Sequence, residues 1–407
     1  MTVDCVVVGA GTAGITTSRA LRDAGVEHVV LERGEVGHTW STQRWDAFAL
    51  NTPGSMNGLL GDVAPDEYST RNETVDLLTA RAADLPVRTH TPVTAVHDDG
   101  DAFRVTTPDD EITARTVVVA SGPKNRPLLP ALAADLPPHV TALHAAAYRT
   151  AAALPEGPVL VVGGGQSGAQ IAHDLVRSGR QVFFSTSRVG RYRAHYRGRA
   201  LLDWHVDSGF WDQTLADLAD PASARVATPL IGPDGQDLGL PLLARLGVQL
   251  LGRLTSVTGA RLGFAGDVEE TVRYADEVAL DMEQLADDYI AVRRLDVEPA
   301  VPDPGRGPVP VTDRPVLDLD AEGIATVIWC TGFGGDFSWL PPHVLDARGW
   351  PLLDTGAAAG LPGLRFAGLP WQTTRSSTIL YGLPTDARVA VDGVTGVLRS
   401  RGPRPAR

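Results

Sequence analysis

The sequence predicts an α/β protein built from two Rossmann-like dinucleotide-binding domains, the second inserted into the first. Three observations support this prediction. The chain has 407 residues, of which 43% are hydrophobic and 21% charged, as expected for a folded protein with two cores. A glycine-rich motif, GAGTAG, follows an apolar run near the start of the chain, and a second motif, GGGQSG, begins at Gly163. Short apolar runs recur between and after the two motifs, as in the strands of parallel sheets.

The first motif lies in a strand–turn–helix–strand unit. An apolar run over residues 3–8 predicts a buried strand. The glycines of the motif are Gly9, Gly11 and Gly14. They suit, in this order, a tight turn, the close approach of a diphosphate, and the packing of a helix on a strand. The next strand ends at Glu32, which is followed by Arg33. Because a carboxylate accepts hydrogen bonds from ribose hydroxyls and repels a 2′-phosphate, this unit is predicted to bind FAD or NAD rather than NADP.

The second motif repeats the unit with one change. Its glycines are Gly163, Gly165 and Gly168, and the last two flank Gln166 and Ser167. The strand after its helix leads to Ser187 and Arg188 and has no carboxylate at its end. Arginine binds phosphate through two parallel hydrogen bonds, so this unit is predicted to hold the 2′-phosphate of NADPH. FAD is then expected at the first motif.

Two further apolar strands end in a small residue followed by a glycine. One leads to Ala120 and Gly122, and the other leads to Thr331 and Gly332. Such ends let a cofactor approach the backbone, so we expect all four residues to contact a cofactor. A plain strand end with a glycine turn is the alternative.

The domain boundaries follow from these units. We expect residues 1–155 and 311–407 to form the FAD-binding domain, and residues 156–310 to form the NADPH-binding domain with a helical insertion. Within the insertion, residues 267–294 carry apolar residues at three- and four-residue spacing, which predicts an amphipathic helix. Residues 298–311 include five prolines and are predicted to form a boundary. The chain is then expected to return to the first domain through the next apolar strand.

Charge and cysteine content disfavour several classes of protein. The formal net charge of −13 argues against nucleic acid or an anionic membrane surface as the main partner. No apolar run is long enough for a transmembrane helix, and no basic leader precedes the first strand. The two cysteines, Cys5 and Cys330, lie in separate apolar runs, which argues against a redox-active dithiol and fits a reducing cytoplasm. The histidines lack metal-ligand spacing, so no metal site is expected.

Together these motifs resemble the flavin-containing monooxygenase superfamily, and more closely its bacterial CzcO-like members. The resemblance extends over nearly the whole chain. It is also carried by the RWD segment that begins at Arg44 and by GLPWQ at residues 368–372. The family's flavin-contacting tryptophan falls on Trp40. The resemblance further implies that Asn51 lies beside the flavin and helps to hold NADP and the oxygenated flavin, although a turn-forming asparagine is the alternative.

The resemblance implies a reaction with O2 and a small-molecule substrate. NADPH reduces FAD, the reduced flavin forms a C4a-(hydro)peroxyflavin, and one oxygen atom passes to a soft nucleophilic nitrogen or sulfur or next to a carbonyl group. His144 and Tyr148 match half of a Baeyer–Villiger linker fingerprint, so a catalytic and a packing role both stay open. The alternatives are an NADPH oxidase or reductase without oxygen insertion, and a flavin-binding redox sensor. A homodimer is one option for the assembly.

The substrate itself is not predicted. The candidates for a substrate pocket are Trp371, Gln372 and Arg375, whereas Trp204, Phe210 and Trp211 are expected mainly in a core. Four arginines after the second motif have two possible roles, in phosphate binding or on a solvated basic face: Arg191, Arg193, Arg197 and Arg199.

Overall fold

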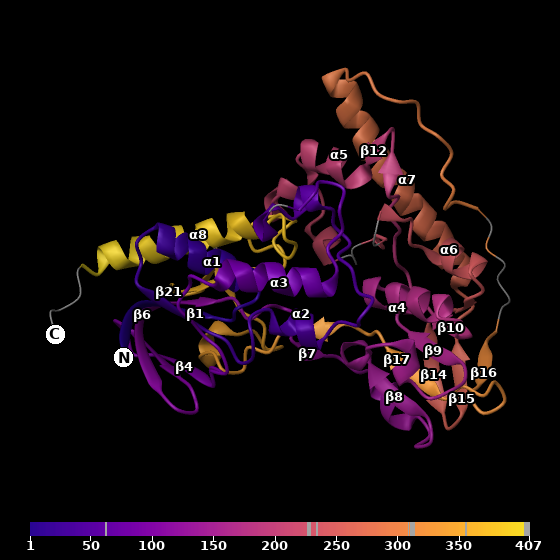
Figure 1. Cartoon of the computed structure of the whole chain (residues 1–407), viewed down its shortest axis with the longest axis horizontal. Helices are drawn as coiled ribbons and strands as arrows, with labels where there is room; N and C mark the ends of the chain where they lie inside the picture. Colours follow the sequence, from indigo (N-terminus) through magenta and orange to yellow (C-terminus); the bar gives the residue numbers. More distant parts are fainter. Residues whose placement is uncertain are drawn as a thin grey trace.

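The structure, a computed structural model, describes residues 1–61, 63–225, 229–232, 235–307, 309, 314–354 and 356–402. Its two largest sheets lie one in each half of the molecule, each with helices packed on it (Figure 1). The predicted α/β class with two Rossmann-like domains is confirmed.

The sheet of the first domain is mixed. Its strand order is β19-β20-β21-β6-β1-β2-β3, and β5 pairs with β6 and with β4. The central pairs β2·β1, β1·β6 and β6·β21 are parallel. The strands are β1 (Thr2–Val8), β2 (His28–Leu31), β3 (Val87–Arg88), β4 (Ala95–Asp98), β5 (Phe103–Thr106), β6 (Glu111–Val119), β19 (Leu353–Asp354), β20 (Ala357–Ala358) and β21 (Leu361–Phe366).

Helices cover one face of this sheet (Figure 1). The helices of the first domain are α1 (Thr12–Asp23), α2 (His38–Thr42), α3 (Arg71–Ala82) and α8 (Leu383–Ser400). Ile15 of α1 and Val391 of α8 join Val7 of β1 in one buried cluster. On the opposite face, Phe103 and Phe337 pack against other residues of the central strands. The alternate residues of β1 therefore reach two different cores, which explains its unbroken apolar sequence.

The sheet of the second domain is parallel throughout. Its strand order is β13-β10-β9-β17-β8. The strands are β8 (Thr141–His144), β9 (Val159–Val162), β10 (Val182–Ser185), β13 (Gln249–Leu251) and β17 (Thr326–Trp329). One face packs on α4 (Gln166–Arg177), on α6 (Leu240–Arg245) and on the start of α7 (Val268–Arg293). The other face packs on the antiparallel strands β14 (Leu254–Thr258), β15 (Arg261–Phe264) and β16 (Val316–Asp318).

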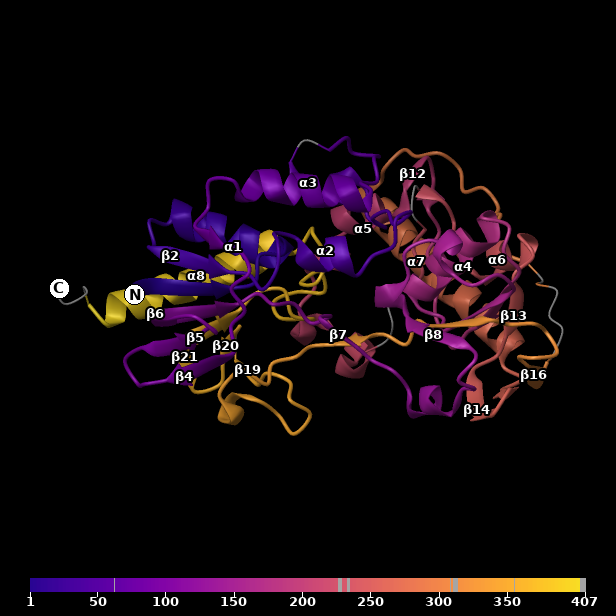
Figure 2. The same ribbon diagram turned by 60° about the horizontal axis from the view of Figure 1, so that its bottom comes forward.

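The return of the chain to the first domain comes later than the sequence analysis expects. Strand β17 does not lie in the first sheet, because it pairs with β9 on one side and with β8 on the other. An apolar parallel strand suits the centre of either sheet, so its local sequence does not select between them. The chain crosses between domains through β7 (Arg126–Pro127) and β18 (Phe333–Gly334), which pair with each other between the two halves (Figure 2).

The helical insertion is organised around α7, which confirms the helix predicted over residues 267–294. Val272, near its start, belongs to the core of the second sheet, and Ala286, near its end, belongs to a separate aromatic cluster. The other elements of the insertion are β11 (His195–Tyr196), β12 (Arg199–Ala200) and α5 (Leu201–Asp207). Of the proline-rich stretch 298–311, residues 308, 310 and 311 lie outside the described residues. Among the described helices, none has the length and apolar character needed to cross a bilayer.

Candidate functional site

The first glycine turn leaves one position open for a ligand. A Cβ atom on Gly9 would lie 2.7 Å from the carbonyl oxygen of Ala120, and a Cβ atom on Gly14 would overlap the carbonyl oxygen of Gly9. At Gly11 a Cβ atom would meet no atom within 4 Å. Gly9 and Gly14 are therefore required by packing, whereas Gly11 leaves space beside the N-terminus of α1. That terminus has no side-chain cap, so its N–H groups suit a diphosphate.

Glu32 holds the backbone around the first turn. Its carboxylate accepts hydrogen bonds from the N–H of Ala10 at 2.7 Å and from the N–H of Gly34 at 3.0 Å. The side chain is buried. A carboxylate fixed in this way at the end of β2 suits ribose hydroxyls, as the sequence analysis expects. The adjacent Arg33 is exposed, and its charge reaches Asp336, where it helps hydrogen bonds from Ser338 to lower the pKa of that carboxyl group.

The second turn repeats this geometry. A Cβ atom on Gly163 would overlap the carbonyl oxygen of Cys330, and a Cβ atom on Gly168 would overlap the carbonyl oxygen of Gly163. At Gly165 a Cβ atom would meet nothing within 4 Å, and Gly165 begins α4 without a side-chain cap. The two turns therefore offer the same anion site, and Ser167 lies in the first turn of α4.

The position of Glu32 is taken by Thr186 in the second turn. Val162 pairs with Ser185 in β10, as Val8 pairs with Leu31 in β2. The residue after each pair is thus Thr186 in one unit and Glu32 in the other. Without a carboxylate, this strand end does not repel a 2′-phosphate.

Arg188 lies exposed beyond this strand end, next to Ser187. Its guanidinium carbon lies 4.1 Å from the centre of the Tyr274 ring on α7. It forms no ion pair with a carboxylate in the described parts of the chain. An exposed arginine oriented by an aromatic ring and free of an acidic partner is suited to phosphate binding.

Gln166 has a structural partner. Its side-chain amide donates to the carbonyl oxygen of Ile231, and its oxygen accepts from the N–H of Ile231 at 3.0 Å. These two bonds hold residues 229–232 against the N-terminus of α4. Gln166 thus closes one side of the second turn, and it lies beside the site rather than pointing freely into it.

The two predicted strand ends lie beside the two turns. Ala120 touches the first turn and Cys330 touches the second, as described above. Gly122 has a φ of +80° and Gly332 a φ of +91°, and at both a Cβ atom would meet nothing within 4 Å. The hydroxyl of Thr331 donates to the carbonyl oxygen of Leu128 at 2.6 Å, so this side chain fixes the interdomain crossing.

Asn51 lies in a loop whose other polar groups are paired. Thr52 donates its hydroxyl to the side-chain oxygen of Asn57 at 2.8 Å, and the amide of Asn57 donates to the carbonyl oxygen of Thr52 at 2.7 Å. Leu50, which precedes Asn51, is buried. Asn51 is only partly buried, and its side chain makes no hydrogen bond within the described residues. The loop therefore holds an amide whose donors and acceptor are available to a ligand.

Trp40, on α2, is partly buried and packs against Phe48, with ring centres 5.7 Å apart. The preceding Gly37 has a φ of +71°, a conformation that favours glycine, and it begins α2. Trp40 and the loop that contains Asn51 therefore belong to the same segment of the chain, which follows the first turn.

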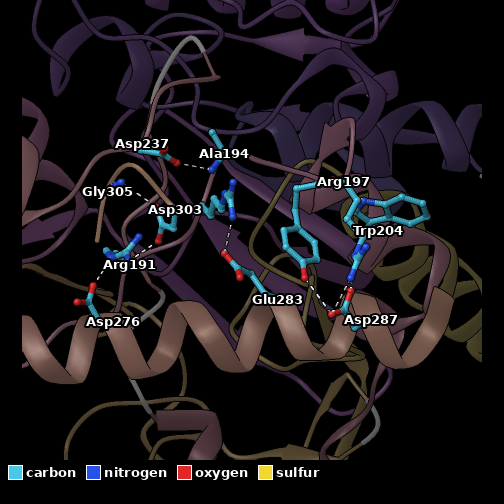
Figure 3. A network of polar contacts seen from close by, with 12 residues as sticks. Arg191, Ala194, Arg197, Trp204, Asp237, Asp276, Glu283, Asp287, Asp303 and Gly305 are labelled. Atoms are coloured by element: carbon cyan, nitrogen blue, oxygen red, sulfur yellow. Dashed lines mark hydrogen bonds and ion pairs between the residues drawn. The ribbon is translucent and has the colours of Figure 1, made fainter. Parts of the chain in front are cut away.

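All four arginines that the sequence assigned to phosphate binding or to a solvated basic face form ion pairs instead (Figure 3). Arg191 is buried and pairs with Asp276 at 2.7 Å and with Asp303 at 2.5 Å. The remaining pairs join Arg193 to Glu283, Arg197 to Asp287 and Arg199 to Asp207. Three of the acidic residues, Asp276, Glu283 and Asp287, lie on α7. Residues 191–197 are therefore fastened along this helix.

His144 and Tyr148 both make packing contacts near the crossing. The N–H of Ala146 donates to Nδ1 of His144, so Nε2 carries the proton and donates to the carbonyl oxygen of Gly332 at 3.0 Å. Tyr148 is fully buried and donates its hydroxyl to Asp174 on α4 at 2.6 Å. Both side chains have partners that join the linker to the second domain.

The C-terminal segment meets the helical insertion in an aromatic cluster. Arg375 lies 4.1 Å from the ring centre of Phe210 and 4.9 Å from that of Trp371, and it donates to Gln213. Gln372 bonds its own turn, through Phe366 and Leu369. Trp204 and Trp211 are buried in the core of this cluster, as expected.

The cysteines do not form a redox pair. Cys5 lies in β1 and Cys330 follows β17 in the other sheet, and both are buried free thiols. Burial raises the pKa of Cys5 to about 12 and raises that of Cys330 as well. Buried thiols of this kind are unreactive. Among the described residues, no group of histidine, cysteine and acidic side chains is placed to hold a metal ion.

Two residues at the second turn escaped the sequence analysis. Gly164 packs so closely on Thr186 and Ser187 that a side chain there would collide with them, and the GGG run is the signal that could have shown it. Tyr274 lies on α7, far from Arg188 in the sequence, and no local signal marks it as the stacking partner.

Comparisons with known proteins agree with this geometry. A family model described as pyridine nucleotide-disulphide oxidoreductase matches residues 6–200. An uncharacterised CzcO-like oxidoreductase of Geobacillus kaustophilus is 27% identical over 400 residues, which cover 96% of this chain and 98% of that protein. A probable indole-3-pyruvate monooxygenase of Arabidopsis thaliana is 30% identical over 212 residues, which cover 48% of this chain and 49% of that protein.

Solved structures share the fold. A flavin-containing monooxygenase from Stenotrophomonas maltophilia has a TM-score of 0.66 at 23% identity, covering 97% of this chain and 98% of that one. A structure of OTEMO in complex with FAD and NADP has a TM-score of 0.55 at 16% identity, covering 97% of this chain and 85% of that one.

Proposed function

We propose that the chain is a member of the flavin-containing monooxygenase superfamily, close to the CzcO-like oxidoreductases to which it is similar, and that it is an FAD- and NADPH-dependent monooxygenase. It transfers one oxygen atom of O2 to a small molecule, at a soft nucleophilic nitrogen or sulfur or next to a carbonyl group. The observation that carries the proposal is the pair of open, uncapped glycine turns at Gly11 and Gly165 in a chain without a dithiol.

The residues of the two turns fit the two nucleotides. Space at Gly11 and the carboxylate of Glu32 fit FAD, whereas space at Gly165, the missing carboxylate at Thr186 and the free Arg188 fit NADPH. When bound, the flavin supplies hydride uptake from NADPH and the activation of O2, which the protein has no residues to perform alone.

The positions of the two cysteines support a small-molecule acceptor for the electrons. Enzymes that reduce disulfides pass electrons from flavin to a reactive cysteine pair. Cys5 and Cys330 are buried in different sheets and cannot serve in this way. A small-molecule acceptor that reaches the flavin, such as O2, remains, so the chain's relation to disulphide oxidoreductases is one of fold.

Asn51 is the residue we assign to the reaction itself. Its amide is free of partners in the described residues, and its loop is fixed by the Thr52–Asn57 bonds. An amide donates to a negatively charged oxygen and accepts from the nicotinamide carboxamide, which a carboxylate does less well. We assign His144 and Tyr148 to the linker rather than to chemistry, since each has its own partner.

The proposal is tested by mixing experiments in a stopped-flow spectrometer. The FAD-loaded protein is reduced with NADPH without oxygen and then mixed with oxygenated buffer without substrate. A spectrum that differs from both oxidised and reduced flavin, and that persists before reoxidation, supports a monooxygenase. Direct return to oxidised flavin with stoichiometric hydrogen peroxide supports an NADPH oxidase instead and contradicts the proposal.

A further inference from the structure

One arginine of the C-terminal segment lies between two aromatic rings. The guanidinium carbon of Arg375 is 4.1 Å from the ring centre of Phe210 and 4.9 Å from that of Trp371. Phe210 belongs to the helical insertion, whereas Trp371 belongs to the segment that follows β21. Both Nε and Nη2 of Arg375 donate to the side-chain oxygen of Gln213, at 3.2 and 2.8 Å. The guanidinium is therefore fixed by two rings and a neutral amide.

Arg375 has no carboxylate partner among the described residues. Arg199 is in a similar setting but differs in this respect, because it lies 4.3 Å from the ring centre of Trp204 and also pairs with Asp207 at 2.8 Å. Arg375 is half-buried, and burial lowers the pKa of its guanidinium. A partly desolvated cation without an anion beside it favours the binding of an anionic ligand.

The backbone at Trp371 is in a rare conformation. Its φ is +53°, in the left-handed region that a bulky residue seldom adopts. The indole N–H of Trp371 donates to the carbonyl oxygen of Ala224 at 3.1 Å, which ties this ring to the insertion. Residues other than glycine cost free energy in this conformation, and they cluster at binding and active sites. The ring that stacks on Arg375 is thus held in place against a backbone strain.

The two segments that hold this arginine also pack against the loop of Asn51. Leu50, the residue before Asn51, packs in one cluster with Leu380 of the C-terminal segment. Met56, at the other end of the loop, packs in the aromatic cluster that includes Phe210 of the insertion. The arginine and the amide to which we assign the reaction are therefore held by the same two segments.

Resting on the proposed function, we propose that Arg375 binds the carboxylate group of the substrate, which is a small organic acid with an apolar body. The guanidinium N–H groups that Gln213 leaves free donate to the carboxylate oxygens. The rings of Phe210 and Trp371 supply apolar walls beside them. The phosphates of the two cofactors have their own proposed sites at the two glycine turns and at Arg188, so the anion at Arg375 is assigned to the substrate.

The proposal is tested by calorimetric titration of the FAD-loaded protein without NADPH. The probes are three matched pairs of an acid and its amide: phenylacetate and phenylacetamide, 4-(methylthio)benzoate and its amide, and 2-naphthoate and its amide. In at least one pair, the wild type is expected to bind the acid about tenfold more tightly than the amide. Arg375→Gln should remove this preference by weakening the acid alone. Arg375→Lys keeps the charge without the planar fork, so it should restore part of the preference.

A second variant, Gln213→Glu, tests the same point without removing the arginine. Its carboxylate would take the place of the amide oxygen that Arg375 already contacts, so it should neutralise the guanidinium and abolish the preference for the acid. A matched control is Arg199→Gln, because Arg199 also faces an aromatic ring but has Asp207 as its partner. The control is expected to bind every probe as the wild type does.

Three outcomes overturn the proposal. The first is the absence of a preference for the acid in all three pairs, and the second is an unchanged preference in Arg375→Gln. The third is a loss of FAD or NADP⁺ affinity that matches the loss of the acid, which would assign Arg375 to a cofactor. If Arg375→Gln does not fold, Gln213→Glu decides alone. Because the titrations involve no turnover, an oxidase result in the stopped-flow experiment would leave this test intact, and a failed titration would leave the monooxygenase proposal standing.

Discussion

Gly163 packs against the carbonyl group of Cys330, the residue that follows the neighbouring strand β17. The first turn has the same contact between Gly9 and Ala120, which follows β6. In both units the first glycine has a positive φ and no room for a side chain. The third residue of each motif, Gly11 or Gly165, instead faces open space. Within one motif, the first glycine is therefore needed for packing and the glycine at the third position leaves room for a ligand.

This difference gives a paired prediction at the second turn. Gly163→Ala should lower the free energy of unfolding by roughly 2 kcal/mol or more, since φ is +123° and the added methyl group overlaps Cys330. Gly165→Ala should leave the melting temperature unchanged but raise the Kd for NADPH, because its methyl group occupies only the space for the ligand. Thermal melting and nucleotide titration measure the two effects. Equal melting temperatures for both variants would contradict this division.

Arg188 is predicted to select NADPH over NADH. Arg188→Ala should raise the KM for NADPH roughly 10- to 100-fold through the loss of charge-assisted hydrogen bonds, with little change for NADH. Arg199→Ala is a suitable control, because Arg199 lies on the same segment but pairs with Asp207. Steady-state kinetics with both nucleotides measure the ratio. A similar rise for NADH would show that Arg188 does not contact the 2′-phosphate.

Asn51 is predicted to affect oxygen transfer and not folding. Asn51→Ala removes a side chain that makes no hydrogen bond to the described residues, so the melting temperature should stay the same, while the ratio of oxygenated product to NADPH consumed should fall roughly tenfold or more. Asn57→Ala should lower stability by about 1 to 3 kcal/mol, unlike Asn51→Ala, because it breaks both bonds with Thr52 that hold this loop. Hydrogen peroxide release and thermal melting separate the two variants. Unchanged coupling in Asn51→Ala would remove it from the reaction.

His205 predicts how stability depends on pH. Burial, and the charge of Arg375, lower the pKa of His205 from 6.5 to about 4, while Tyr192 donates to its Nδ1 and its Nε2 donates to Met282. As the pH falls below 6.5 the unfolded chain binds a proton that the folded chain excludes. The free energy of unfolding should therefore decrease from pH 6.5 to about pH 4, by roughly 3 kcal/mol in total.

Chemical denaturation at several pH values tests this expectation. The decrease should be smaller by roughly 3 kcal/mol in His205→Gln and retained in full in His139→Gln, since His139 is exposed and bonds to Asp320. The buried His28 and His144, whose pKa values are also lowered, account for a decrease that remains. The same pH dependence in wild type and His205→Gln would assign the effect to other groups.

The sequence was sufficient for the parts of the fold that depend on local sterics. The glycine spacing reports contacts within a few residues, such as Gly14 against Gly9, so both turns and their helices could be predicted. The sheet to which β17 belongs could not, because a short apolar strand fits the centre of either sheet. Its partners β8 and β9 are set by packing between distant segments.

The ion-pair partners of the arginines could not be predicted from the sequence either. Arg191 and Arg193 looked like a phosphate site or a solvated face, because their partners Asp276 and Glu283 are more than 80 residues away. Arg188 belongs to the same stretch and remains without an acidic partner among the described residues. Only the three-dimensional arrangement separates the one arginine suited to phosphate from those that fasten a helix.

The pairing of residues 191–197 with α7 makes this helix intolerant of changes in length. Asp276, Glu283 and Asp287 share one face because they are spaced by seven and four residues. Inserting a single residue between Asp276 and Glu283 would rotate the distal half by about 100° and displace it by about 1.5 Å. Arg193 and Arg197 would then face apolar side chains, and the aromatic cluster around Ala286 would lose its register. We therefore expect insertions and deletions among related proteins in the loops around α7 and not within α7 itself.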